Sequence, residues 1–254
     1  MSWDPGRYLV FQEERERPAL DLLARIPEGV FRAVDLGCGP GNSTELVQRR
    51  FPGAAVLGVD SSSEMIETAR RRLPGIPFEI SDIADWRGED ACDLIFANAA
   101  LQWVPDHAAL LPRLLGQLAP GGALAVQMPD NLDEPAHRAM REVAADGPWT
   151  KLLTKAVKAR EPRRDAGWYF ELLRGAGASP EVWRTTYHHP LAGAEAVVAW
   201  FRSTGLRPYL DPLDPEMREG FLDAYREAIA RAYPALSDGT ILLPFPRLFL
   251  LARV

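Results

Sequence analysis

The first half of the chain alternates short apolar runs with segments whose apolar residues recur every three or four positions. The apolar runs predict buried strands at residues 33–36, 55–59, 77–80, 93–97 and 123–127. The three- and four-residue spacing predicts helices between them, at residues 43–51, 63–73 and 108–118. Pro120, Gly121 and Gly122 indicate a sharp turn into the fifth strand. This alternation is typical of a parallel sheet with helices on both faces.

After residue 130 the pattern becomes mostly helical. Helices are predicted at residues 132–145, 150–158, 167–176, 195–203 and 215–233, and two further strands at 182–188 and 247–252. We expect the two strands to complete a mostly parallel, seven-stranded α/β sheet of Rossmann-like type. The expected organisation is a single domain over residues 1–254, with an N-terminal lid and first helix (1–30), a ligand-binding core (31–130), mostly helical cap insertions with one sheet strand near 182–188 (131–246) and a final strand (247–254).

Composition is that of an ordinary globular protein. Apolar residues make up 47% and charged residues 25%, which argues against disorder, collagen and coiled coil. The formal charge is 29 − 35 = −6 and no long basic run occurs, so we expect no nucleic-acid partner. No signal peptide or apolar membrane span is expected, which predicts a cytoplasmic protein. Cys38 and Cys92 fit reduced thiols, and the four scattered histidines form no metal pattern.

The most informative segment is Val-Asp-Leu-Gly-Cys-Gly-Pro-Gly-Asn-Ser-Thr at residues 34–44. A buried strand runs directly into three glycines, which let the backbone pass close to a ligand, and then into a helix. A tight strand-to-helix turn without any ligand is the alternative interpretation. Asp60 ends the second strand about 20 residues further on, where an acidic side chain can bind both hydroxyls of a ribose.

The loop spacing favours one nucleoside over another. A dinucleotide site reads G-x-G-x-x-G, whereas this loop reads G-x-G-x-G, and Asp35 stands two residues before the first glycine. A carboxylate there repels a pyrophosphate but suits a cation such as an amino group. S-adenosylmethionine is therefore favoured over NAD, and an NAD-dependent oxidoreductase is the disfavoured alternative.

In these features the chain resembles the class I methyltransferases. The resemblance implies that Asp60 holds the ribose, that Asp82 and Ile83 meet the adenine, and that the segment from Ser61 to Met65 packs on the adenine face. A turn role for Asp82 and a core role for Met65 are the alternatives. The full set of residues expected to bind S-adenosylmethionine, with S-adenosylhomocysteine as its product, is Asp35, Gly37, Cys38, Gly39, Gly41, Asn42, Asp60, Ser61, Met65, Asp82, Ile83, Asn98 and Phe11.

The end of the fourth strand limits the acceptor. Class I enzymes that methylate amino groups of adenine or glutamine resemble one another in an Asn-Pro-Pro-Tyr or Asp-Pro-Pro-Tyr motif there, and residues 98–101 read Asn-Ala-Ala-Leu. A cysteine nucleophile for cytosine would follow this strand, whereas Cys92 precedes it. Enzymes that methylate catechols need a metal ion held by a cluster of acidic residues, and the sequence lacks that cluster. A small or carrier-bound acceptor remains.

A closer resemblance covers nearly the whole chain. Residues 3–5, 14–19, 98–103, 203–210 and 243–249 look like the corresponding segments of the trans-aconitate 2-methyltransferases, although Ser203 stands where a glycine is expected. That family forms a monomethyl ester on one carboxylate of a tricarboxylic acid. A carboxylate with an unperturbed pKa near 4 is already ionised at pH 7, so we expect alignment of the reactants and no catalytic general base.

The other carboxylates of such an acceptor need fixed cations, preferably arginines. The residues expected to bind the acceptor are Arg207, Arg247, Tyr209, Gln102, Trp103, Arg17 and Tyr8. Alternatives stay open at several positions. Arg207 or Arg247 could pair with an acidic residue of the cap, and Trp103 could be a core residue. Tyr8 and Phe11 could form a lid over the nucleoside or dock the first helix.

The sequence thus predicts an S-adenosylmethionine-dependent carboxyl O-methyltransferase that acts on trans-aconitate or a related polycarboxylic acid. One alternative is methylation of another acid, such as a carrier-bound malonyl group or a natural product. Another is a nonenzymatic S-adenosylmethionine-binding protein. We expect a monomer with a small-molecule substrate and no membrane partner.

Overall fold

The structure is a computed structural model, and it describes residues 12–158, 164–202 and 204–254. Its internal contacts divide the chain into two compact units. The sheet unit comprises Glu13–Pro129, Arg164–Thr185 and Arg247–Val254, and the helical unit is drawn from the described parts of residues 130–163 and 186–246. Two of the unit boundaries fall inside long strands, β6 (Ser179–Leu191) and β7 (Ile241–Arg253).

The sheet has seven strands in the order β3-β2-β1-β4-β5-β7-β6. The first five along the chain are β1 (Arg32–Leu36), β2 (Ala55–Asp60), β3 (Phe78–Ile80), β4 (Cys92–Asn98) and β5 (Leu118–Pro129). Neighbours among these five pair in parallel, and β7 pairs with β5 in the antiparallel sense. The predicted α/β fold with a mostly parallel seven-stranded sheet is confirmed.

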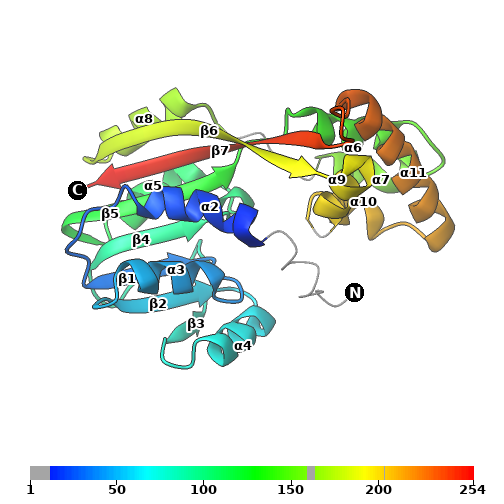
Figure 1. Ribbon diagram of the computed structural model, residues 1–254. Coiled ribbons are helices and arrows are strands. Elements are labelled where there is room, and N and C mark those ends of the chain that lie inside the picture. The colour runs from blue at the N-terminus through cyan, green and yellow to red at the C-terminus, as the bar shows by residue number, and fades with distance from the viewer. Residues whose placement is uncertain (1–11, 159–163, 203) are drawn as a thin grey trace. The chain divides into compact units, whose positions relative to one another are not determined.

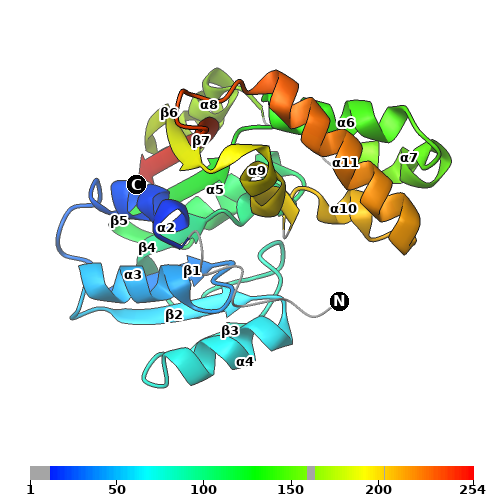
Figure 2. The same ribbon diagram turned by 45° about the vertical axis from the view of Figure 1, so that its right-hand side comes forward.

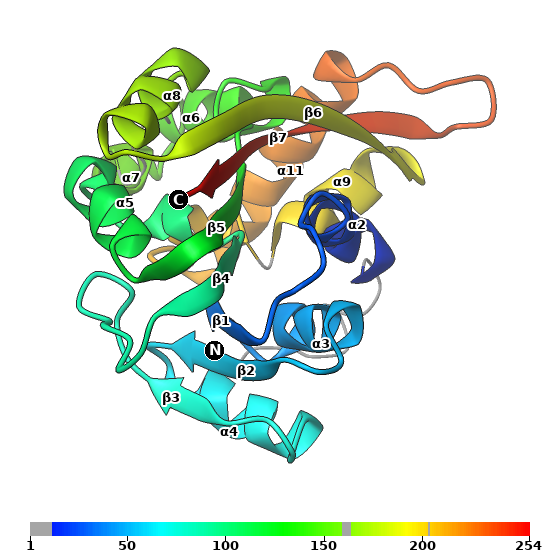
Figure 3. The ribbon, with the colours of Figure 1, turned by 90° about the vertical axis from the view of Figure 1, so that its left-hand side faces the viewer.

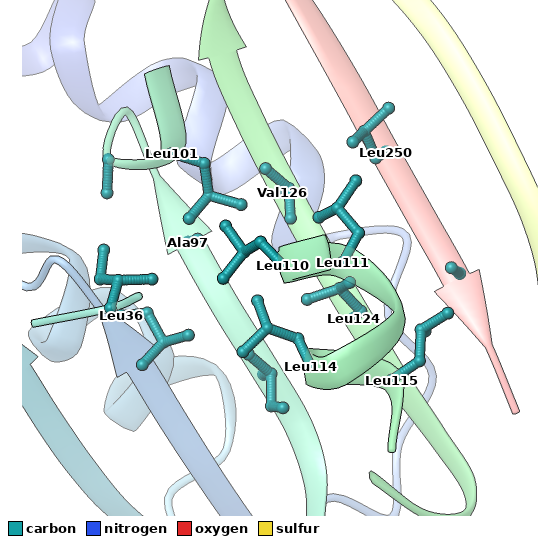
Figure 4. Close-up of a cluster of buried hydrophobic side chains, with 14 of the residues drawn as sticks. Leu36, Ala97, Leu101, Leu110, Leu111, Leu114, Leu115, Leu124, Val126 and Leu250 are labelled. Carbon is teal, nitrogen blue, oxygen red and sulfur yellow. The ribbon is translucent and has the colours of Figure 1, made fainter. Parts of the chain in front are cut away.

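Helices lie on both faces of this sheet. The helices of the sheet unit are α2 (Gln12–Leu23), α3 (Asn42–Arg50), α4 (Ser63–Arg72), α5 (His107–Leu115) and α8 (Ala166–Gly175). Helices α2 and α3 lie on one face, and α5 and α8 on the other (Figure 3). The four buried leucines of α5 sit over side chains from β1, β4, β5 and β7 (Figure 4). They follow the three- and four-residue spacing that predicted this helix.

The structure differs from the sequence-based prediction at three places. Helix α8 was expected in the cap, but Tyr169 and Leu173 are buried in the core of the sheet unit. Strand β5 begins at Leu118, before the expected turn. Leu118 already pairs with Cys92, and Ala123 pairs with Leu94, so the residues between them form an irregular bulge within the strand and not a turn before it. Strand β7 begins at Ile241 and not near residue 247.

The early start of β7 was hidden by two prolines. Pro244 and Pro246 lack the N–H that a strand donates, so the pattern favoured a start after them. The carbonyl oxygen of Pro246 nevertheless accepts from the Asp130 N–H at 2.9 Å. Side chains of Ile241, Leu243 and Phe245 are buried in alternation with more exposed neighbours, as a strand requires.

The helical unit has its own hydrophobic core. Its helices are α6 (Pro135–Ala145), α7 (Thr150–Lys158), α9 (Gly193–Arg202), the unpredicted short α10 (Arg207–Leu210) and α11 (Pro215–Ala232). Helix α11 lies along α6 in two views (Figures 1 and 2) and contacts α9 as well. Trp149, Trp200 and Phe221 are among the buried aromatic residues that fill the space between them. In the parts of the chain that the structure describes, no helix is both long and apolar enough to cross a membrane.

Candidate active site

The glycine loop begins where β1 ends. The N–H groups of Gly37 and Cys38 both donate to the carbonyl oxygen of Val59, at 2.7 and 3.0 Å, which ties the loop to β2. Gly37 has φ +73°, and a Cβ placed on it would lie 2.3 Å from the Cβ of Ala100. This first glycine is therefore required by the fold itself, because any side chain would collide with the chain that follows β4.

The second glycine is required for a different reason. Gly39 has φ +55°, and a Cβ placed on it would meet no atom within 4 Å. The backbone thus offers an open side at Gly39, as the approach of a ligand to a glycine loop requires. Gly41 has φ +90° and precedes α3, and the side-chain oxygen of Asn42 accepts from Arg72 at 3.3 Å.

Asp35 is fully buried beneath the loop. The hydroxyls of Ser43 and Thr44, at the start of α3, each donate to its Oδ2 at 2.7 Å. Its other oxygen, Oδ1, has no hydrogen-bond partner among the described residues. Burial raises the pKa of the Asp35 carboxyl from 3.8 to about 6, the two hydroxyls act in the opposite direction, and the charge of Asp60 raises the pKa further. A buried anion with an unused oxygen fits a ligand that brings a positive charge.

The raised pKa of Asp35 predicts a pH-dependent stability. Because the folded chain holds this proton more tightly than the unfolded chain, Asp35 contributes most stability below pH 4, and the contribution is lost as the pH rises to about 6. The free energy of unfolding of the ligand-free wild type should therefore rise by about 1.4 kcal/mol from pH 8 to pH 5 relative to that of Asp35→Asn, in which residue 35 cannot titrate. Any stability advantage of Asp35→Asn at pH 8 should shrink by this amount. Urea unfolding of both proteins at each pH measures this; an advantage that is the same at both values contradicts it.

Asp60 is held in place from two sides. Its Oδ2 accepts from the N–H of Gly39 and its Oδ1 from the N–H of Ser62, each at 2.9 Å. The carboxylate therefore joins the glycine loop to the start of α4. It is half-buried, and each oxygen keeps a second lone pair that can accept from a hydroxyl. This arrangement suits the predicted ribose contact.

Further residues expected around the nucleoside lie in the chain after β2 and β3 and on α4. Ser61 is exposed and Met65 half-buried on α4, while Ile83 is buried. Asp82 is exposed, and its Oδ1 accepts from the Ala84 N–H at 2.8 Å, so it does form the turn that was the alternative interpretation. A turn carboxylate keeps further lone pairs, so the adenine contact of Asp82 stays a prediction.

Cys38 is a buried loop residue with no sign of reactivity. Its side chain packs with Ile66, Ala69 and Phe78. Burial, followed by the charges of Asp35 and Asp60, raises the pKa of the Cys38 thiol far above its ordinary value. Cys38 is thus a core residue whose contribution to the loop is its backbone.

The chain after β4 is strained and polar. Ala99 adopts φ +53°, a conformation that costs a non-glycine residue about 1 kcal/mol or more and is often found at functional sites. The Gln102 amide donates to the carbonyl oxygen of Ala99 at 2.5 Å, and the Gln102 Oε1 is buried without a hydrogen-bond partner among the described residues. Trp103 is 61% exposed, so it is no core residue. The Gln102 Oε1 can therefore still accept a hydrogen bond from a ligand.

The two arginines expected to bind carboxylates differ sharply. Arg247 is 5% exposed in the sheet unit, and its Nη1 donates to the Gln127 Oε1 at 3.4 Å. Arg207 is exposed in the helical unit, with its Nε 3.9 Å from the Asp211 carboxylate. The acid partner that was the alternative interpretation for Arg207 is therefore present.

For three other residues expected to bind the acceptor, the described part of the structure gives no contact that bears on this role. Tyr209 is 7% exposed and stacks on Phe221 in the core of the helical unit. Arg17 is exposed on α2. Tyr8, like Phe11 of the expected nucleoside site, lies outside the described residues.

Gln127 and His107 were not among the site residues predicted from the sequence. Gln127 is fully buried on β5, and its amide donates to the Asn98 Oδ1 at 2.5 Å. The His107 ring bonds to the Tyr169 hydroxyl and to the Leu101 carbonyl oxygen, each at 2.8 Å, and so fastens the segment that carries Gln102 and Trp103. A polar residue within an apolar strand was the signal for Gln127.

Within the described ranges, no three His, Cys, Asp or Glu side chains are placed to hold a metal ion.

The fold and the loop together define a class I methyltransferase, and comparison with known proteins agrees. A family model described as a methyltransferase domain matches residues 33–122. The YcgJ protein of Bacillus subtilis shares the fold with a TM-score of 0.61 at 14% identity, over 93% of this chain and 98% of that chain. A phosphoethanolamine N-methyltransferase 2 of Haemonchus contortus, solved with S-adenosyl-L-methionine, has a TM-score of 0.56 at 16% identity, over 92% and 52% of the two chains.

Sequence relatives narrow the class. A trans-aconitate 2-methyltransferase of Methylobacterium radiotolerans is 59% identical over 255 residues, which cover 99% of this chain and 98% of that protein. One of Yersinia pestis is 53% identical over 256 residues, with the same coverage of both proteins. The chain belongs to the trans-aconitate 2-methyltransferase family.

Proposed function

We propose that this protein transfers a methyl group from S-adenosylmethionine to one carboxylate of trans-aconitate and so forms a monomethyl ester. The observation that carries the proposal is identity of 59% over essentially the full length of a relative of that name. The site supports it independently through the glycine loop with Asp35 and Asp60 around it. The free, buried Cys38 and Cys92 are consistent with a reducing, cytoplasmic location, and we keep a monomer as part of the proposal.

The residues present fit S-adenosylmethionine. The unused Oδ1 of buried Asp35 suits the amino group of the methionine part, because a positive charge nearby offsets the cost of the buried carboxylate. The Asp60 carboxylate suits the ribose hydroxyls, and the open side of Gly39 lets the ligand approach the backbone. When bound, S-adenosylmethionine supplies a methyl group on a positively charged sulfur, and S-adenosylhomocysteine remains after transfer.

Methyl transfer to a carboxylate does not require the protein to supply a general base. The acceptor carboxylate is already ionised at pH 7, so no side chain has to remove a proton. What remains is to hold the oxygen about 3–3.5 Å from the methyl carbon and in line with the sulfur. Attack of an anion on a cation removes charge, so exclusion of water favours the reaction.

We propose that arginines fix the carboxylates of the acceptor that do not react. Arg247 is the stronger candidate, because it is buried and its guanidinium donates to Gln127 on β5, which in turn contacts Asn98 at the end of β4. Arg207 is the second candidate, and Asp211 then has to release it or share it. The buried oxygen of Gln102 can accept from an N–H or O–H group of S-adenosylmethionine.

A panel of acids tests this proposal. Production of S-adenosylhomocysteine is measured with trans-aconitate, cis-aconitate, citrate, isocitrate and dicarboxylates that lack one carboxylate. We expect trans-aconitate to have the highest kcat/KM, and each missing carboxylate to lower kcat/KM by about 10-fold or more, because a charge-assisted contact with an arginine is then lost. If no acid of the panel is turned over while S-adenosylmethionine still binds, the acceptor is wrong and a carrier-bound or natural-product acid replaces it.

A further inference from the structure

Three polar side chains form a continuous chain across three neighbouring strands. The Arg247 Nη1 on β7 donates to the Gln127 Oε1 on β5 at 3.4 Å, and the Gln127 Nε2 donates to the Asn98 Oδ1 on β4 at 2.5 Å. Asn98 pairs with Gln127 in the register of the sheet, at the last residue of β4. Gln127 is fully buried and Arg247 is 5% exposed, so water has little access to these bonds. Hydrogen bonds in such surroundings are costly to break or reverse.

The chemistry of the three groups gives the chain one direction. A guanidinium only donates, so the amide of Gln127 has to turn its oxygen to Arg247 and its NH₂ group to Asn98. Asn98 in turn has to present its oxygen to Gln127, which leaves its own NH₂ group directed elsewhere. Reversing either amide would place a donor against a donor. No described residue accepts from the Asn98 Nδ2, and the half-buried Asn98 stands at the end of the strand where the site lies.

The backbone beside Asn98 is fixed as well. Ala99 has φ +53°, its N–H donates to the Gln127 carbonyl oxygen at 2.9 Å, and its own carbonyl oxygen accepts from Gln102. Gln127 therefore holds both the side chain of Asn98 and the residue after it. Such a held donor is suited to an anionic oxygen, with which an N–H forms a stronger bond than with a neutral one.

We propose that Gln127 is a positioning residue that directs the Asn98 NH₂ group to a carboxylate oxygen of a bound ligand. The inference rests on the proposed function, in which two ligands carry carboxylates: the methionine part of S-adenosylmethionine and the polycarboxylate acceptor. Arg247 sets the direction from the far end of the chain. Asn98 makes the contact, and Gln127 determines which of its two amide atoms the ligand meets.

Gln127→Glu is the decisive substitution. It keeps the shape of the side chain and can still accept from Arg247, but it replaces the donor facing Asn98 with an acceptor. The intact Asn98 then turns its NH₂ group to Glu and presents its oxygen to the ligand. We expect binding of the carboxylate ligand to weaken by about 10-fold or more, with a thermal midpoint close to that of the wild type.

Asn98→Asp is the second substitution. It keeps the oxygen that accepts from Gln127 and places a negative charge where the NH₂ group was. We expect a loss of ligand affinity at least as large as with Gln127→Glu, because two carboxylates then face each other. Gln48→Glu on α3, whose amide contacts only backbone oxygens of residues 51 and 52 in the described structure, adds the same charge away from the site and should change nothing.

Two readouts separate the two carboxylates. The Kd for S-adenosylhomocysteine is measured by calorimetry, and the KM for trans-aconitate at saturating S-adenosylmethionine. A raised Kd in both variants assigns the contact to the methionine carboxylate, and a raised KM with an unchanged Kd assigns it to the acceptor.

The inference is overturned if both variants stay within about 2-fold of the wild type in both readouts, or if Asn98→Asp weakens binding and a folded Gln127→Glu does not. A wild-type protein that does not methylate trans-aconitate refutes the proposed function. The calorimetric Kd then decides the inference alone, and an unchanged Kd in both variants overturns it.

Discussion

Replacement of Asp60 by alanine is expected to raise the Kd for S-adenosylmethionine by about 100-fold. The side chain offers a fixed anion to two ribose hydroxyls, and hydrogen bonds to a charged group contribute roughly 1.5–3 kcal/mol each. A loss of about 3 kcal/mol corresponds to about two powers of ten in affinity. The substitution also removes the acceptor for the N–H groups of Gly39 and Ser62, so the loop loses part of its support. Isothermal titration calorimetry measures the Kd.

Two comparisons make this result specific. Asp85→Ala removes an exposed carboxylate of the same unit and should leave the Kd unchanged. Asp60→Asn keeps the shape and one oxygen, so it should fall between the alanine variant and the wild type. A Kd for Asp60→Ala within about 3-fold of the wild-type value would remove Asp60 from the nucleoside site.

Gly37→Ala is expected to lower the thermal midpoint by about 5–15 °C. The added methyl group would lie 2.3 Å from the Cβ of buried Ala100, and overpacking of this kind costs about 1–3 kcal/mol. The left-handed backbone at φ +73° adds about 1 kcal/mol for a residue with a Cβ. In a chain of this size each kcal/mol moves the midpoint by about 2–4 °C. Thermal unfolding followed by circular dichroism provides the measurement.

Gly39→Ala is the matched control. Its backbone is also left-handed, at φ +55°, but the methyl group would enter open space, so only about 1 kcal/mol of stability should be lost. The same methyl group should weaken S-adenosylmethionine binding, because it occupies the side from which the ligand approaches. Ala100→Gly should restore part of the stability of Gly37→Ala and none of the binding of Gly39→Ala. Equal losses of stability in the two glycine variants would contradict the collision at Ala100.

The sequence was most informative where function and local geometry coincide. The three glycines, Asp35 and Asp60 follow one another at short spacing on consecutive strands, and each position has a backbone or electrostatic reason that a sequence can reveal. The central strands were predicted to within a few residues because they are continuous apolar runs between helices. This alternation predicted the first five strands, and two further apolar runs after residue 130 predicted the two strands that complete the sheet.

What the sequence could not predict depends on contacts between distant residues. Gln127 meets Asn98 across 29 positions and Arg247 across 120, so no local pattern places these three side chains together. The hydroxyls of Ser43 and Thr44 were visible beside the loop, but only the fold turns them toward Asp35. Helix α8 has an ordinary helical pattern, and tertiary packing alone assigns it to the sheet unit.

The identity of the product tests the central claim most directly. The purified protein is incubated with trans-aconitate and S-adenosylmethionine that carries a labelled methyl group, and the product is analysed by mass spectrometry before and after mild alkali. Our account predicts trans-aconitate carrying one labelled methyl group, which alkali removes to regenerate trans-aconitate, as an ester requires. A methylated product that survives alkali, or no methylated trans-aconitate from a protein that binds S-adenosylmethionine, would contradict it.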